Sequence, residues 1–93
     1  MNETTTLAAR ADLVAEAARA CMVACAELAA AGLTVLSAHA RPGAPLVLVT
    51  IPPERSGLHG ALRRRTRYEE VLIDRLPSGV LVQWCRRRAG VRP

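Results

Sequence analysis

The feature that most constrains this chain is a long N-terminal stretch, Leu7 to Ala31, that contains neither proline nor glycine. Threonines at positions 4–6 offer hydroxyl groups that can cap a helix, and Gly32 can adopt the left-handed conformation at which helices commonly end. Apolar residues recur at the spacing of one buried stripe, namely Leu7, Ala11, Val14, Ala18, Cys21, Cys25 and Leu28. The sequence therefore predicts one long helix over about residues 6–31.

The predicted helix is too long for a small sheet to cover. About 25 residues in a helix measure roughly 37 Å, whereas a six-residue strand spans only about 20 Å. The helix is therefore expected to overhang the sheet. Its flanks are rich in alanine, which permits close approach of a second helix: Ala8, Ala15, Ala26, Ala29 and Ala30. Two interpretations of the overhang stay open, a frayed helix end and the seam of a homodimer.

The rest of the chain is expected to form a sheet over about residues 33–87. Residues 33–40 mix β-branched and apolar side chains, and residues 46–51 are almost entirely apolar, as in a central strand. Pro52 and Pro53 end that second strand, because proline has no N–H to donate to a neighbouring strand.

Residues 61–76 fit either a helix or a strand. Tyr68, Val71 and Leu72 have helical spacing, but the run from Val71 to Ile73 is typical of a strand, and residues 76–80 read as a tight turn. We favour a strand over about residues 67–76, followed by a partner strand over residues 80–87.

This predicted hairpin has a definite register, because its three-residue loop fixes which residues lie opposite each other. Leu72 is expected to oppose Trp84, while Glu70 and Glu69 oppose the arginines at 86 and 87. The complete prediction is an α+β fold in which one long N-terminal helix packs on a small, about four-stranded, antiparallel sheet. Residues 1–93 are expected to form a single domain with a short C-terminal tail at 88–93.

The sequence also bears on where the protein acts. No apolar run approaches the roughly 20 residues of a membrane span, and the first residues lack the basic character of a signal peptide. The cysteines are odd in number (Cys21, Cys25 and Cys85), which favours a reduced, cytoplasmic setting. We expect a cytoplasmic protein with no membrane partner.

Metal binding and catalysis have weak support. Cys21 and Cys25 lie one helical turn apart, but structural zinc sites usually use two-residue spacers, so both cysteines are expected to act as small apolar side chains. His39 or His59 could serve as a base for Cys85 or Ser56, yet no motif places these groups together. We therefore predict a protein that is not an enzyme, with no catalytic residue, metal or cofactor.

Charge is the strongest functional signal. The chain has thirteen basic and eight acidic residues, a net charge of +5, and every basic residue is arginine. Ten arginines and four acidic residues fall in residues 46–93, which gives this part a net charge of +6. Such a surplus indicates a negatively charged partner, because guanidinium groups bind carboxylates and phosphates through paired hydrogen bonds.

The densest cluster is Arg63-Arg64-Arg65-Thr66-Arg67. On a regularly extended chain, Arg63, Arg65 and Arg67 would lie on one side and Arg64 on the other. The two glutamates of the hairpin are expected to pair with the second cluster, whereas the first has no obvious carboxylate partners. The candidate binding residues are Arg63, Arg64, Arg65 and Arg67, with Arg86, Arg87 and Arg88 as a second group.

Three segments, Leu46-Val47-Leu48-Val49-Thr50-Ile51-Pro52-Pro53, Gly60-Ala61-Leu62-Arg63-Arg64 and Gly79-Val80-Leu81-Val82-Gln83-Trp84, resemble short accessory proteins of prophages and mobile elements in GC-rich bacteria. Among these, anti-CRISPR inhibitors act by occluding a surface of a host complex. The resemblance assigns no residue role, and a chain of charge +5 differs from the acidic members that mimic DNA.

The sequence thus predicts a non-catalytic binding module, in the manner of a phage-encoded stoichiometric inhibitor, that contacts an acidic protein surface or a nucleoprotein complex. The alternative is direct, largely sequence-independent binding of DNA or RNA. Tyr68 and Trp84 are the only aromatic residues, so the several stacking faces typical of single-strand binding are missing.

Overall fold

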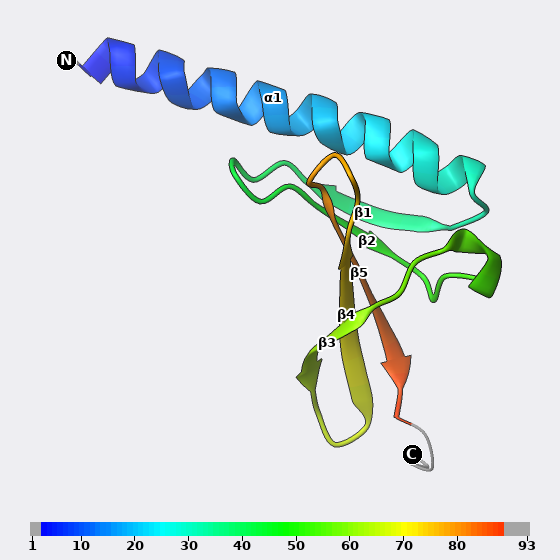
Figure 1. Cartoon of the computed structure of the whole chain (residues 1–93). Coiled ribbons are helices and arrows are strands. Elements are labelled where there is room, and N and C mark those ends of the chain that lie inside the picture. Colours follow the sequence, from blue (N-terminus) through cyan, green and yellow to red (C-terminus); the bar gives the residue numbers. More distant parts are fainter. Residues whose placement is uncertain (1–2, 89–93) are drawn as a thin grey trace.

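The computed structural model describes residues 3–88 and shows a long helix lying across a twisted sheet (Figure 1). The helix, α1, spans Glu3–Ala30. The strands are β1 (Val35–His39), β2 (Leu46–Val49), β3 (Ala61–Arg65), β4 (Glu69–Arg75) and β5 (Leu81–Arg87), and a short 3-10 helix, η1 (Glu54–Ser56), lies between β2 and β3. The predicted α+β class, with one long N-terminal helix on a small sheet, is confirmed.

The sheet has one strand more than expected, and it is mixed. Its order is β1-β2-β5-β4-β3. All neighbouring pairs are antiparallel except β2 and β5, which run parallel, with Leu46 beside Leu81 and Leu48 beside Gln83. The parallel pair arises because the chain leaves β2, builds β3 and β4 at the far edge, and returns with β5 into the space beside β2.

The ambiguous segment at residues 61–76 forms two strands, β3 and β4, so the favoured strand interpretation is confirmed and the helical one is wrong. The predicted hairpin register is also confirmed: Leu72 lies opposite Trp84, and Glu70 lies opposite Arg86. The Leu76 N–H donates a hydrogen bond of 2.9 Å to the Val80 carbonyl, which closes the turn.

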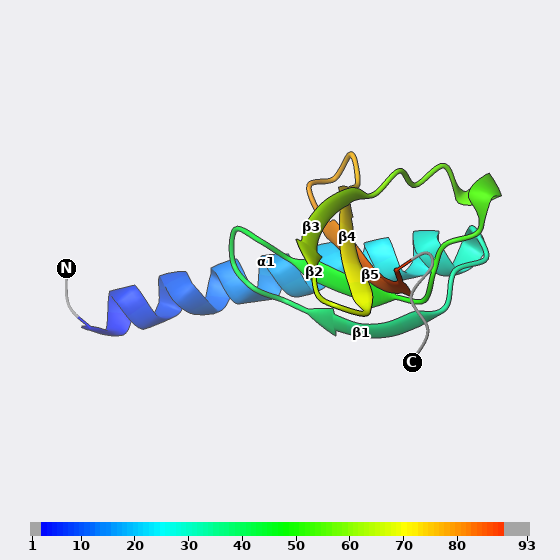
Figure 2. The same ribbon diagram turned by 90° about the horizontal axis from the view of Figure 1, so that it is seen from below.

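Among the helix residues whose side chains are described, only those in the C-terminal half of α1 are buried. Cys21, Ala24 and Leu28 belong to the core that also contains Val47, Val82 and Trp84, and Ala17 is buried near the β1–β2 loop and the β4–β5 turn. From residue 9 to residue 16 the helix is exposed, so the predicted overhang is confirmed (Figures 1 and 2).

The predicted buried stripe is right at Cys21 and Leu28 and wrong farther toward the N-terminus. Val14 is 45% exposed, and Ala11 is exposed as well. The reason is the short sheet, which ends before it reaches the first half of the helix. The side chain of Leu7 lies outside the described part of the structure.

One face of the sheet is left uncovered by the helix. Side chains alternate between the two faces of a strand, so the residues between the core positions, such as Leu48, Gln83 and Cys85, face away from α1. Figure 2 views the sheet from this side, with the strands in front of the helix. The β3–β4–β5 end of the sheet projects away from α1, and the molecule measures 56 × 30 × 19 Å.

No helix within residues 3–88 has both the length and the apolar character that crossing a membrane requires. The predicted tail at 88–93 is described only at Arg88, and its other residues lie outside the described range.

Candidate arginine-rich binding surface

A bulge in β3 determines where the first arginine cluster points. Leu62 pairs with Leu72, but Arg64 pairs with Val71, so Arg63 is an extra residue in the edge strand. An extra residue breaks the alternation of side chains, because two residues of the bulged strand face one residue of its partner. Arg63 and Arg64 therefore lie on the same face of the sheet, and the predicted separation of Arg64 from Arg63 is wrong.

Both arginines border a hollow of about 370 Å³ on the uncovered face of the sheet. We call it the arginine hollow; it is lined by Arg41, Leu46, Arg63, Arg64, Val71 and Gln83. The Arg63 guanidinium donates a hydrogen bond of 2.6 Å from Nη1 to Oε1 of Gln83. Leu46 and Val71 are buried although they face away from α1, as expected where the aliphatic parts of arginine side chains cover them.

Arg41 belongs to this site although the sequence analysis did not select it. It lies in the loop between β1 and β2, five residues before Leu46, and far along the chain from the arginine clusters. Arg41 can be assigned to the site only when the strand order is known, because β2 must lie beside β5 for Arg41 to come near Gln83.

Two other arginines of the predicted set form ion pairs with one carboxylate on the opposite face of the sheet. Nη2 of Arg65 lies 3.0 Å from Oε2 of Glu70, and Nε of Arg86 lies 3.6 Å from Oε1 of the same carboxylate. The pairing of Arg86 was predicted, but Arg65 was expected to have no carboxylate partner and that expectation is wrong. The bulge is again the cause, because it brings Arg65 directly opposite Glu70.

The pKa of the Glu70 carboxyl lies below its ordinary value of 4.5, chiefly because of the hydrogen bond from Arg65 and also through the charges of Arg65 and Arg86. A carboxyl whose pKa is lower in the folded state than in the unfolded state stabilises the fold above its unfolded pKa. That stabilisation is lost as the pH falls through the folded pKa.

We expect the melting temperature of the wild-type protein to fall more steeply than that of Glu70→Gln as the pH is lowered from 6 to 3. The variant cannot lose this carboxylate and should be less stable than the wild type at pH 7. Thermal unfolding followed by circular dichroism at several pH values measures both slopes. Parallel slopes for the two proteins would contradict the role given to Glu70.

The remaining predicted arginines surround the turn between β3 and β4. Nη1 of Arg88 donates to the carbonyl oxygens of Thr66 and Arg67, at 3.3 and 3.4 Å, and thereby holds the turn. The Arg67 guanidinium lies 5.4 Å from the centre of the Tyr68 ring, within the range of a cation–π interaction. Arg87 lies opposite Glu69, but no ion pair within 4.0 Å joins them.

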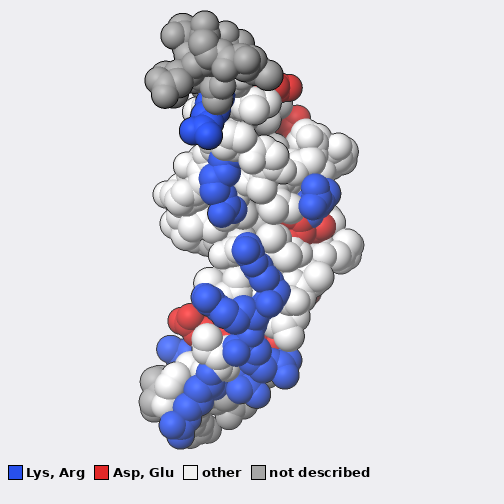
Figure 3. All heavy atoms as spheres, turned by 90° about the vertical axis from the view of Figure 1, so that its left-hand side faces the viewer, with Lys and Arg blue, Asp and Glu red and all other residues white. Residues whose placement is uncertain are grey.

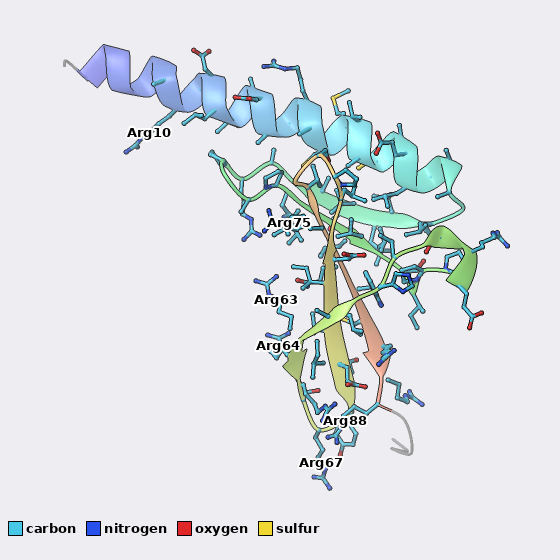
Figure 4. The ribbon with its side chains drawn as sticks, viewed as in Figure 1. Arg10, Arg63, Arg64, Arg67, Arg75 and Arg88 are labelled. Carbon is cyan, nitrogen blue, oxygen red and sulfur yellow. The ribbon has the colours of Figure 1, made fainter. Side chains whose placement is uncertain are left out.

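The arginines form a column along one side of the molecule. Figure 3 shows positive side chains from the region of α1 down to the end of the β3–β4–β5 part, where they are densest. Figure 4 labels members of this column on α1, β3, β4 and the β3–β4 turn: Arg10, Arg75, Arg63, Arg64 and Arg67. Among the side chains that the structure describes, those of residues 9–88, carboxylates form ion pairs only with Arg65 and Arg86.

The cysteines and histidines do not assemble into a second site. Cys21 is buried on α1, and burial raises the pKa of its thiol, with a smaller contribution from Cys25. His39 Nε2 lies 3.1 Å from the Ser37 hydroxyl, and the backbone N–H of His59 donates to Asp74. The described residues contain no group of three or more His, Cys, Asp or Glu side chains placed to hold a metal ion.

Comparison of the chain with protein-family models, with curated proteins and with solved structures finds no match.

Proposed function

We propose that this chain is a non-catalytic binding module that contacts an acidic surface of a partner protein or nucleoprotein complex through the uncovered face of its sheet. The observation that carries the proposal is the bulge in β3, which brings Arg63 and Arg64 together on that face beside Arg41. The mode of action proposed is stoichiometric: the module occludes the surface it binds, as small phage-encoded inhibitors do.

Some arginines are engaged within the protein and others keep free donors, and this difference supports the proposal. Arg65 and Arg86 share the single negative charge of Glu70, and Arg88 donates to backbone carbonyl groups, so these three arginines contribute to the fold. Arg63 contacts only a neutral amide, and its guanidinium has five N–H groups, so donors are left over for a partner. A guanidinium can bind a carboxylate through two parallel hydrogen bonds, which gives both affinity and orientation.

The experiment that tests the proposal reverses the charge at the arginine hollow. We expect Arg63→Glu/Arg64→Glu to weaken binding of a fluorescein-labelled poly-glutamate peptide by about tenfold or more, because it replaces two attractive charges by repulsive ones. Fluorescence anisotropy at low salt measures the dissociation constant.

The matched control is Arg19→Glu/Arg55→Glu, which changes the net charge equally at exposed positions on α1 and η1. It should retain binding to within about threefold, since only the long-range field changes. Equal losses in the two variants would show that net charge, and not this site, governs binding, and the proposal would fail.

Direct binding of nucleic acid is the second candidate, and the arginine column in Figure 3 favours it because a phosphate backbone also presents charges along a line. Four to six phosphate contacts would give a log–log salt slope of about −3.6 to −5.4 on duplex DNA. A titration of a 25-base-pair duplex that is flat in salt would exclude this candidate.

A further inference from the structure

The uncovered face of the sheet has a second hollow, and this one is mainly apolar. We call it the apolar hollow; it has a volume of about 530 Å³ and is lined by Leu36, Leu48, Val49, Thr50, Ile51, Gln83, Trp84 and Cys85. Leu36 is 64% exposed and Ile51 is 60% exposed, values that are high for aliphatic side chains of this size. A concave apolar surface of this kind marks a site of interaction more often than an isolated exposed leucine does.

The two hollows adjoin each other along β2 and β5. Gln83 lines both, and on β2 the arginine hollow includes Leu46 whereas the apolar hollow includes Leu48. Two residues along a strand cover about 7 Å, so one short segment of a partner chain can lie across both hollows. The uncovered face thus offers positive charge at one end and apolar contact at the other.

We propose that the two hollows form one docking site for a peptide segment of a partner protein that has aliphatic side chains next to a cluster of carboxylates. This inference rests on the function proposed above and adds the chemistry of the partner. The aliphatic side chains enter the apolar hollow, and the carboxylates contact Arg41, Arg63 and Arg64. Charge complementarity sets the orientation of the segment, and apolar burial adds affinity.

The charge and composition of the face argue against other occupants. A second copy of this chain would bring no carboxylate to the arginine hollow, because neither hollow is lined by an acidic residue, and the positive charges of the two copies would repel each other. A nucleic acid would use the arginines but gain little from the apolar hollow, whose one aromatic residue, Trp84, is only 6% exposed and cannot offer a stacking face. The exposed aromatic residue, Tyr68, lies in the β3–β4 turn beneath Arg67.

The first test selects binders from a library of random 12-residue peptides displayed on yeast, with the wild-type chain as bait. We expect the enriched peptides to combine aliphatic and acidic residues, and synthetic copies to bind about tenfold or more weakly to Leu36→Ser/Ile51→Ser. Met22→Ser/Val23→Ser removes two comparably exposed apolar side chains from α1, outside both hollows, and should bind as the wild type does.

The rate at which Cys85 is alkylated provides a second test, which needs no mutation. Cys85 is the exposed cysteine and lines the apolar hollow, whereas Cys25 on α1 is half-buried and lies outside it. A selected peptide at saturation should slow alkylation of Cys85 about tenfold and leave Cys25 unchanged. A partner that contacts the arginines alone would leave both rates as they are.

The outcomes separate the two proposals. This inference would be overturned if the enriched peptides were acidic without aliphatic residues, bound Leu36→Ser/Ile51→Ser as tightly as the wild type, and left Cys85 reactive. The arginine-based function would then still stand. An empty selection would overturn this inference as well, and binding of duplex DNA with the expected salt slope would then identify the occupant as nucleic acid. If Arg63→Glu/Arg64→Glu and its control Arg19→Glu/Arg55→Glu bound poly-glutamate equally weakly, the proposed function itself would fail.

Discussion

Replacing Leu28 by alanine is expected to lower the free energy of unfolding by about 2–5 kcal/mol, whereas Leu13→Ala in the same helix should cost about 0.5 kcal/mol or less. The two leucines differ in burial: Leu28 is 4% exposed and packs in the core, while Leu13 is 52% exposed on the overhang. Removing a buried leucine loses its transfer free energy and leaves a cavity, and neither penalty applies at an exposed site.

The expected loss at Leu28 is large for a chain of this size, because domains below 100 residues have small cores and marginal stability. Urea unfolding followed by the fluorescence of Trp84, the only tryptophan, measures both variants under the same conditions. A cost of about 2 kcal/mol or more for Leu13→Ala would contradict the exposed overhang. It would show that a second copy covers the helix in solution, and the apparent stability would then rise with protein concentration. The homodimer stays a prediction until this is measured.

The elements that the sequence predicts well are those whose signals are local. The helix could be predicted because no proline or glycine interrupts it, and because Gly32, just after its last residue, has a φ of +91° in the left-handed region that ends helices. The hairpin register is readable because the short loop after Leu76 leaves one main way to pair β4 with β5. In both cases a few neighbouring residues contain the information.

Two features of the sheet could not be predicted from local sequence. The parallel pairing of β2 with β5 places Leu46 beside Leu81, which is far from it along the chain, and no local pattern in β2 indicates this neighbour. The bulge at Arg63 lies within the β3–β4 hairpin, but no glycine or proline within residues 61–67 indicates the extra residue. Without it, Arg63 and Arg64 would occupy opposite faces and Arg65 would not reach Glu70.

The candidate site could therefore be predicted only in part from the local sequence. The arginine cluster shows that a positive surface exists, and the glutamates of the hairpin correctly indicate that some of it is neutralised internally. The bulge in the edge strand β3 determines which arginines face outward, because one extra residue changes the face on which each later side chain lies. The contribution of Arg41 and the adjoining apolar hollow follow from the strand order.

Substitution of Gly60 by alanine is the second change expected to have a large effect, a loss of about 1–3 kcal/mol in the free energy of unfolding. A Cβ at this position would lie 2.5 Å from Cζ2 of Trp84 and 2.8 Å from both Cη2 of Trp84 and Cβ of Leu72. The backbone of the loop before β3 thus passes directly over the Trp84 ring, and only glycine leaves room for both.

A double-mutant cycle with Trp84→Phe tests this steric origin. Phenylalanine lacks the outer ring atoms that a Cβ at Gly60 would meet, so the combined variant should be more stable than the sum of the two single losses implies, by about 0.5 kcal/mol or more. Relief should be incomplete, because the contact with Leu72 remains. Urea unfolding followed by far-ultraviolet circular dichroism suits all four proteins, including those without the tryptophan. Strictly additive losses would contradict the close approach to the Trp84 ring as the reason that glycine is required here.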